Sequence, residues 1–323
     1  MAVRAFVFPG QGSQSVGMGL ALYEAFGVAR EVFQEVDDAL SFKLSEIIFR
    51  GEPAILTSTE NAQPALMAVS MATLRVLEHE GGFKIQDRAA LVAGHSLGEY
   101  SALAAAGSFG VAQAARLLRL RGQAMQRAVP AGEGGMAALM GVDLDQAQDI
   151  CDAAAMVQVE GQADRHEVIE VANDNGGGQV VISGVMSAIE RAVLISRERK
   201  VKRAVVLPVS APFHCSLMKP AADEMAEALA SAEIAAPVVP LVANVTAAKV
   251  TSPDEIRSLL VRQVTGSVLW RETILAMAAM GIDTVVELGS GKVLSGLVRR
   301  IDGDIATASA GTPDEIEALL KTF

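Results

Sequence analysis

The sequence predicts an α/β fold: a large α/β-hydrolase-like domain with a largely parallel sheet, into which a small ferredoxin-like domain is inserted. Short apolar runs typical of buried strands alternate with longer segments of helical periodicity, and this alternation favours a parallel sheet. Between residues 133 and 207 the order becomes strand, helix, strand, strand, helix, strand, which is the ferredoxin-like order. Residues 1–132 and 208–323 are therefore expected to form the large catalytic domain, with a ligand cleft between the two.

The individual elements follow from apolar runs and from helical periodicity. In the large domain, strands are expected at 4–8, 89–93, 238–242 and 284–288. Helices are expected there at 62–79, 97–106, 111–129, 221–230 and 253–263. In the inserted domain, strands are expected at 135–142, 168–173, 179–183 and 203–207, and helices at 144–155 and 187–200. Capping boxes mark helix starts at 252–255 and 312–315.

Composition limits the class of protein. The 323 residues carry 27 basic and 38 acidic side chains, and this net charge of −11 argues against general nucleic-acid affinity. Cys151 and Cys215 lie far apart without metal-ligand spacing and are expected to be reduced thiols. No apolar run approaches the length that crosses a bilayer, and the N-terminus does not have the pattern of a signal peptide. We expect a cytoplasmic protein that binds neither membrane nor metal.

The segment Gly94-His95-Ser96-Leu97-Gly98 has the pattern of a nucleophile elbow. It follows an apolar, strand-like run and opens an alanine-rich, helix-like run, which is the structural context that the Gly-x-Ser-x-Gly motif requires. The glycines allow a tight turn that lifts the serine hydroxyl to the start of the helix. Backbone N–H groups there have no helical partner and can hold an oxyanion. Ser96 is thus the predicted nucleophile.

A serine nucleophile needs a neighbouring base, and the chain has four histidines. His79 lies where a helix is expected to end, and His166 lies in a polar connection, so both are expected in solvent. His95 adjoins Ser96 on the elbow, and its side chain should point away from that of the serine. His214 follows an apolar strand at a domain boundary, which is a suitable place for a catalytic base.

A serine esterase or thioesterase of the α/β-hydrolase type is the alternative interpretation. Such an enzyme would add an Asp or Glu between the serine and the histidine to orient the imidazole. Acidic residues of that interval fall mostly in the inserted domain, and none stands at a strand end of the main sheet. A dyad of Ser96 and His214, with the imidazole oriented by a backbone carbonyl, fits better.

Arg121 lies on the apolar face of the helix expected at 111–129. Its neighbours at three, four and seven residues are alanine, leucine and methionine, whereas Arg116, Arg119 and Arg127 share the polar face. Because an unpaired buried charge is costly, Arg121 is expected to meet a carboxylate. That carboxylate belongs either to the protein or to a substrate whose acyl group ends in one, and the spacing alone does not decide between the two.

The chain resembles the malonyl-CoA:acyl carrier protein transacylases of type II fatty acid synthesis. The resemblance extends from the first strand nearly to the C-terminus. It is carried by segments that appear in the family order: Pro9-Gly10-Gln11-Gly12-Ser13-Gln14, Gln63-Pro64-Ala65, Gly94-His95-Ser96-Leu97-Gly98-Glu99, Arg121-Gly122-Gln123-Ala124-Met125, Gln179-Val180-Val181-Ile182-Ser183-Gly184, Ala211-Pro212-Phe213-His214, Gln263-Val264 with Val268 and Trp270, and Glu287-Leu288-Gly289.

The resemblance implies an acyltransferase that moves malonyl from malonyl-CoA to the phosphopantetheine thiol of acyl carrier protein in ping-pong fashion. It implies that Ser96 is acylated and that His214 moves the proton. It implies further that Arg121 binds the malonyl carboxylate and that the backbone N–H groups of Gln11 and Leu97 form the oxyanion hole. It implies no metal or redox cofactor, since the CoA thioester is a substrate. We expect a monomer.

Further substrate-binding residues are implied in the same way. Gln263 is expected to line the site and to hold the histidine ring through its backbone carbonyl, and Leu97 and Phe213 match the malonyl-selecting form. Asn173 belongs to a segment that departs from the family pattern, because Gly176, Gly177 and Gly178 stand where the family usually has Ser-Pro-Gly. These three glycines are expected to loosen the loop.

Overall fold

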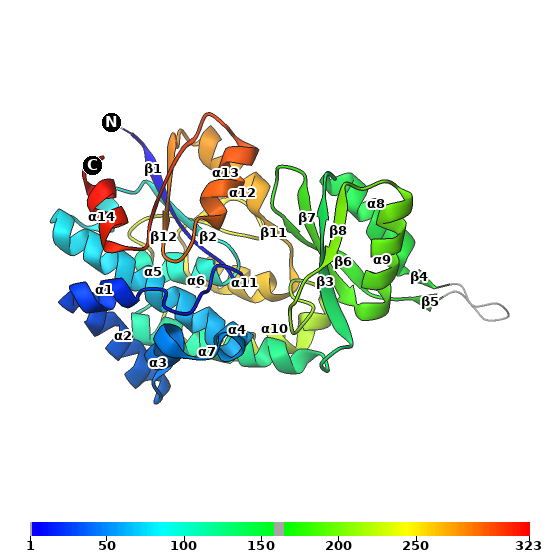
Figure 1. Cartoon of the computed structure of the whole chain (residues 1–323), viewed down its shortest axis with the longest axis horizontal. Coiled ribbons are helices and arrows are strands. Elements are labelled where there is room, and N and C mark those ends of the chain that lie inside the picture. Colours follow the sequence, from blue (N-terminus) through cyan, green and yellow to red (C-terminus); the bar gives the residue numbers. More distant parts are fainter. Residues whose placement is uncertain (1, 158–164) are drawn as a thin grey trace.

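The computed structural model describes residues 2–157 and 165–323 (Figure 1). In this part of the chain six strands form the main sheet, in the order β10-β9-β2-β1-β12-β13. All neighbours run parallel except β10 and β9, which confirms the largely parallel sheet. The strands of this sheet are β1 (Arg4–Phe8), β2 (Leu91–Gly94), β9 (Leu241–Val242), β10 (Lys249–Val250), β12 (Thr284–Leu288) and β13 (Ala306–Ala310).

Helices cover both faces of the main sheet. Side chains of β1 alternate between the two layers, so that Phe6 and Phe8 pack with α5 to α7 whereas Ala5 and Val7 pack with α12 and α13. The helices of this part are α1 (Leu20–Ala25), α2 (Gly27–Leu40), α3 (Leu44–Arg50), α4 (Pro53–Thr57), α5 (Thr59–Gly81), α6 (Leu97–Ala105), α7 (Val111–Ala128), α10 (Lys219–Ser231), α11 (Pro253–Thr265), α12 (Trp270–Ala279), α13 (Val293–Ile301) and α14 (Pro313–Leu320), with short 3₁₀ turns at Ile85–Asp87 and Ser216–Met218.

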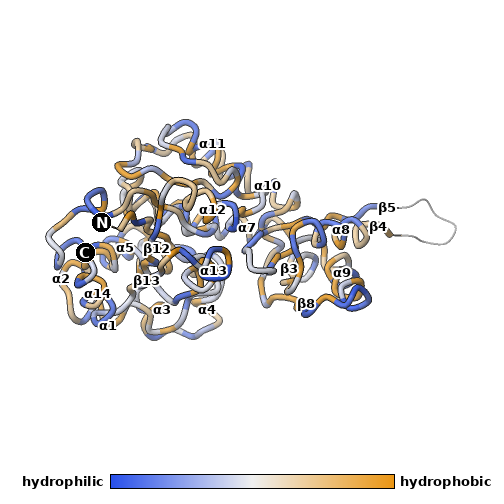
Figure 2. The backbone as a smooth tube through the Cα atoms, turned by 90° about the horizontal axis from the view of Figure 1, so that it is seen from above, coloured by the Kyte–Doolittle hydropathy of each residue, from blue (hydrophilic) through white to orange (hydrophobic). Residues whose placement is uncertain are grey.

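A second sheet lies beside the first, in the order β11-β6-β7-β3-β8. Its neighbours are antiparallel except β11 and β6, and α8 and α9 pack on one face. Figure 2 shows β3, β8, α8 and α9 as a smaller body next to the larger one. The elements are β3 (Gly134–Met140), α8 (Leu144–Ala155), β4 (Met156–Val157), β5 (Arg165–His166), β6 (Ile169–Asp174), β7 (Gln179–Val185), α9 (Met186–Glu198), β8 (Arg203–Val206) and β11 (Val268–Leu269).

Two expected boundaries are wrong for identifiable reasons. The helix expected at 62–79 starts three residues earlier, although Pro64 lies inside it. The proline leaves the carbonyl of Glu60 without its helical donor, and Arg119 donates to that oxygen instead at 3.2 Å. The strand expected at 238–242 shrinks to Leu241–Val242, because Pro240 has no N–H to offer a neighbouring strand.

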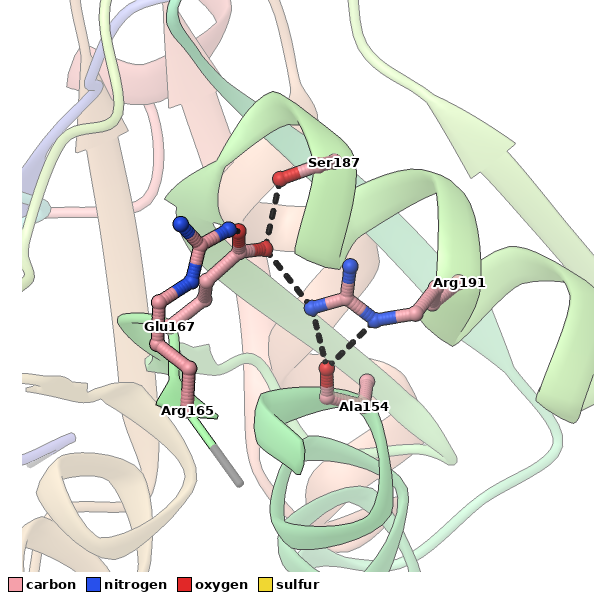
Figure 3. Close-up of polar contacts among 5 residues, drawn as sticks. All are labelled: Ala154, Arg165, Glu167, Ser187 and Arg191. Carbon is pink, nitrogen blue, oxygen red and sulfur yellow. Dashed lines mark hydrogen bonds and ion pairs between the residues drawn. The ribbon is translucent and has the colours of Figure 1, made fainter. Parts of the chain in front are cut away.

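A polar cluster joins the β4–β5 hairpin to α8 and α9 (Figure 3). Arg191 of α9 donates through Nε and Nη2 to the carbonyl oxygen of Ala154, in the last turn of α8. Its Nη2 also contacts Glu167, whose carboxylate accepts from Ser187 and Arg165. The guanidinium therefore caps the C-terminus of α8, where a cation is favourable, and anchors the hairpin.

Replacement of Arg191 should therefore destabilise the smaller body. Arg191→Ala is expected to lower the free energy of unfolding by about 1–2 kcal/mol, because a charged donor to a half-buried carbonyl and carboxylate is lost. Arg165→Ala is the matched control: its side chain is 71% exposed, so its ion pair with the same Glu167 should contribute less than about 0.5 kcal/mol. Thermal unfolding of both variants checks this, and equal losses would contradict it.

Candidate active site

A cavity of about 400 Å³ lies between the two sheets. It is lined by the elbow after β2, by α7 and by the loop that follows β8. It gathers Ser96, Arg121 and His214 from three distant parts of the chain. The other predicted residues that line it are Gln11, Leu97, Asn173 and Phe213.

The elbow has the backbone that the sequence pattern requires. Ser96 has φ 53° and ψ −110°, a conformation that is strained for a residue with a side chain. The flanking glycines are needed for space: a Cβ on Gly94 would lie 1.9 Å from the carbonyl carbon of Gly98, and a Cβ on Gly98 would lie 2.2 Å from the carbonyl oxygen of Phe8. The turn therefore packs directly against the ends of β1 and β2.

Asn244 clamps this turn from the loop after β9. Its Nδ2 donates to the carbonyl oxygen of Gly94 at 2.7 Å, and its Oδ1 accepts from the Ser96 N–H at 2.8 Å. In the described part of the chain, the N–H groups of Gln11 and Leu97 have no acceptor. They are thus available to a ligand oxygen, whereas the N–H of Ser96 is occupied.

Ser96 and His214 are in hydrogen-bond contact, with 2.7 Å between Oγ and Nε2. The Nδ1 of His214 lies 2.9 Å from the carbonyl oxygen of Gln263 and 3.2 Å from that of Gly266. Since both acceptors are carbonyls, Nδ1 carries the proton and Nε2 faces Ser96 as an acceptor. The imidazole is thus oriented by backbone oxygens, and no carboxylate of the described residues forms an ion pair with it.

Burial of His214 lowers its pKa to about 3, and the nearby positive charge of Arg121 acts in the same direction. Its hydrogen bonds to the Gln263 and Gly266 carbonyls oppose this shift without overcoming it. The imidazole is therefore neutral at physiological pH, which is the form that accepts a proton from a hydroxyl.

Arg121 is 1% exposed and faces the serine, with 3.2 Å between Nη2 and Ser96 Oγ. Its guanidinium is held by two neutral amides: Nη1 donates to Gln63 Oε1 at 2.7 Å and Nη2 to Gln263 Oε1 at 2.8 Å. No acidic group within the described ranges lies within 4 Å of it, so an internal ion pair, one of the two alternatives that the sequence left open, is not found among these residues. Burial lowers the pKa of Arg121, but a guanidinium remains charged at neutral pH.

Gln263 connects the groups of the site. Its backbone holds His214, its Oε1 accepts from Arg121, and its Nε2 donates to the carbonyl oxygen of Ser96 at 3.0 Å and to Glu99 Oε2 at 2.5 Å. Glu99 is buried beside the elbow. Burial raises the pKa of Glu99 to about 7, against the opposing effect of the Gln263 and Asn244 hydrogen bonds and the charge of Arg121.

Several polar residues of the site were not assigned from the sequence. Gln63 and Asn244 contact Arg121 and Ser96, and Glu99 contacts Gln263. Neutral amides have no sequence signature of their own, and a single glutamate in the first turn of a helix has none either. His95 points away from Ser96, as expected. Its Nε2 lies 2.9 Å from Asn175 Oδ1, and its ring packs against Trp270.

The glycine loop after Asn173 differs from the expectation of a loosened segment. Gly176, Gly177 and Gly178 all have positive φ, between 59° and 76°. A Cβ on Gly176 would lie 2.3 Å from the Ile301 side chain, so the loop packs closely against α13. The glycines serve this close approach and the left-handed backbone, and the loop forms part of the cavity wall.

Two features are absent from the described residues. Among the residues that the structure describes, no group of three or more His, Cys, Asp or Glu side chains could hold a metal ion. Within the same ranges, no helix combines the length and apolar character needed to span a bilayer.

A hydroxyl with an adjacent neutral base, free N–H donors and a buried cation define an acyl-transfer enzyme. The family model described as "Acyl transferase domain" matches residues 5–300. The chain belongs to this family, and within it to the malonyl CoA-acyl carrier protein transacylases. Relatives of that name from Bacillus subtilis and Escherichia coli are 42% and 43% identical, over 100% and 98% of this chain and 98% of each relative.

Solved structures agree with this assignment. An acyl-carrier-protein-S-malonyltransferase from Bartonella henselae is 55% identical, covers 99% of both chains and has a TM-score of 0.94. A malonyl-transacylase solved in complex with a type II PKS acyl-carrier protein is 39% identical over the whole of both chains, with a TM-score of 0.93. The mixed α/β fold with a mostly parallel central sheet is thus shared with these enzymes.

The lowered pKa of His214 predicts how acylation depends on pH. A histidine with its ordinary pKa of about 6.5 would lose roughly eightfold of its neutral form between pH 7 and 5.5. Because His214 stays neutral until well below pH 6.5, kcat/KM for the acyl donor should change less than about twofold over that range in Glu99→Gln, a variant in which the Glu99 carboxyl, with its pKa of about 7, no longer titrates. A stopped-flow pH profile checks this, and an eightfold fall centred near pH 6.5 would contradict it.

Proposed function

We propose that this protein transfers malonyl from malonyl-CoA to the phosphopantetheine thiol of acyl carrier protein through an ester on Ser96. One observation carries the proposal: a buried guanidinium lies 3.2 Å from the Ser96 hydroxyl, and among the described residues it has no carboxylate within ion-pair distance. Buried charges are otherwise paired, so the partner of this cation is the carboxylate of the acyl group. The names of the relatives support the same substrate and carrier.

In the first half-reaction, His214 Nε2 takes the proton of Ser96 while Oγ attacks the thioester carbonyl. The negative oxygen of the tetrahedral intermediate is held by the N–H groups of Gln11 and Leu97. As the C–S bond breaks, the imidazolium returns its proton to the CoA sulfur. Malonyl is left as an ester on Ser96, and His214 is neutral again.

The second half-reaction reverses these proton movements. His214 removes the proton of the phosphopantetheine thiol, the sulfur attacks the ester, and the proton passes to Ser96 Oγ as it leaves. The same donors stabilise both tetrahedral intermediates. CoA leaves before the carrier protein reacts with the malonyl ester, and this covalent intermediate is the basis of ping-pong kinetics. No step uses a metal or redox cofactor.

Arg121 selects the acyl group by charge and shape. A guanidinium binds a carboxylate through two parallel hydrogen bonds, and these are strong in a buried site. The guanidinium is pre-positioned by Gln63 and Gln263, so little ordering is needed when the acyl group arrives. Phe213, Leu97 and Asn173 complete the wall against which the short acyl chain lies.

The proposal extends to the organisation of the chain. We assign residues 133–207 to a ferredoxin-like subdomain inserted into an α/β-hydrolase-like domain of 1–132 and 208–323, supported by the strand order β8-β3-β7-β6. A monomer is sufficient, since one chain supplies all groups of the site. The free and buried Cys151 and Cys215 suit a reducing compartment such as the cytoplasm.

Acylation of Ser96 is the direct test of the function. Incubation with malonyl-CoA alone should add one malonyl group, located on Ser96 by peptide mass spectrometry, and subsequent acyl carrier protein should remove it. Ser96→Ala should stay unmodified. Release of the group to water at the same rate with and without carrier protein would instead support the alternative, a serine esterase or thioesterase.

Replacement of Arg121 tests selectivity. Arg121→Ala should lower kcat/KM for malonyl-CoA by about a hundredfold, since a buried charged contact worth about 2–5 kcal/mol is lost. The rate with acetyl-CoA should hold or rise. Arg127→Ala is the control, because Arg127 lies on the same helix but is 58% exposed and paired with Glu224. Equal losses for malonyl and acetyl donors in Arg121→Ala would contradict charge selection.

A further inference from the structure

Glu99 is a buried carboxylate that the reaction steps above do not use. It is 1% exposed and lies three residues after the nucleophile, in the first turn of α6. No lysine or arginine of the described residues lies within ion-pair distance of it. Since burial of an unpaired carboxylate is costly, its place beside the active site requires a reason.

The usual role of a glutamate at this helix position does not apply. In a capping box, the third residue of the helix accepts from the N–H of the N-cap residue. Here the N-cap is Ser96, and its N–H is bonded to Asn244 Oδ1. The carboxylate of Glu99 turns instead toward α11.

Glu99 Oε2 accepts from Gln263 Nε2 at 2.5 Å and from the Asn244 N–H at 3.4 Å. In its ionised form Glu99 only accepts hydrogen bonds, so it then requires the NH₂ end of the Gln263 side chain to face it. The same NH₂ group donates to the carbonyl oxygen of Ser96. These contacts fix the orientation of the Gln263 side-chain amide, with its NH₂ group toward Glu99 and the Ser96 carbonyl oxygen.

The opposite end of the amide is thereby directed at the guanidinium. Gln263 Oε1 accepts from Arg121 Nη2 at 2.8 Å. With the amide reversed, its oxygen would face the Glu99 carboxylate and its NH₂ would face the Arg121 donors, so both contacts would become repulsive. Only one orientation satisfies both charged neighbours.

We propose that Glu99 is a positioning residue that sets acyl selectivity: it locks the Gln263 amide in the orientation that holds Arg121 beside Ser96. The inference rests on the proposed function and deepens it. Glu99 does not touch the acyl group. It acts through Gln263. Without Glu99, the side-chain amide of Gln263 should be free to rotate, and the Arg121 guanidinium should move away from Ser96.

Two variants with side chains similar in size to Glu99 distinguish the effect of losing its hydrogen bond from the effect of losing its volume. Glu99→Gln keeps an oxygen acceptor for Gln263 Nε2, whereas Glu99→Met offers only a thioether sulfur, which is a weak acceptor. Glu99→Ala, which leaves a cavity, serves where the methionine variant does not fold. The readout is the ratio of kcat/KM for malonyl-CoA to that for acetyl-CoA, because a general loss of structure lowers both and leaves the ratio unchanged.

Glu99→Gln should keep this ratio within about threefold of the parent protein, and Glu99→Met or Glu99→Ala should reduce it by about tenfold or more, mainly through the KM for malonyl-CoA. Asp37→Asn is the control: Asp37 is a buried carboxylate on α2 that binds Ser45, away from the cavity, and its loss should lower the melting temperature without changing the ratio.

Two results would overturn the inference: an unchanged ratio in Glu99→Met or Glu99→Ala, or a ratio in Glu99→Gln that falls as far as in the other two. Neither result would contradict the proposed function, which is tested separately by malonylation of Ser96 in the protein without substitutions. Failure of that malonylation would overturn the function itself, whatever the Glu99 variants do.

Discussion

The site depends on a cation that is buried without a protein anion. Arg121 lies on the apolar face of α7 and is held by the oxygens of Gln63 and Gln263. Neutral amides orient a guanidinium but do not neutralise it, and Glu99, which interacts with this charge, is not within ion-pair distance of it. A bound carboxylate removes the cost of this buried charge, and the free energy gained favours anionic acyl groups over neutral ones.

The turn that carries Ser96 is held in place by backbone packing and by hydrogen bonds to Asn244. The strained φ of Ser96 persists because Asn244 ties both sides of the turn together and because the flanking glycines contact the end of β1 and each other. His214 also has a positive φ, of 59°, and is fixed by two carbonyls near the end of α11. Strain at both Ser96 and His214 is thus balanced by contacts from several strands and loops.

The sequence predicted the parts of this site that have a pattern. Ser96 stood out through its glycines, His214 through elimination of the other histidines, and Arg121 through its place on an apolar helix face. The strands at 4–8 and 284–288 were predicted to the residue, because continuous apolar runs mark buried parallel strands.

The remainder depends on contacts between distant segments. Gln63 and Asn244 are neutral and lie on elements whose periodicity says nothing of a site, so only the fold brings them to Arg121 and Ser96. The helices between residues 20 and 57 were not assigned, and the glycine loop was expected to be loose although it packs against α13. Sequence patterns indicate the chemistry of single residues. The hydrogen bonds that orient these residues depend on tertiary contacts between distant segments, which the patterns do not show.

The most direct test is a crystal structure of the enzyme trapped with malonyl on Ser96. The free carboxylate of the ester should lie within hydrogen-bond distance of the Arg121 guanidinium, inside the cavity. A carboxylate that points to solvent, with Arg121 contacting only Gln63 and Gln263, would contradict it.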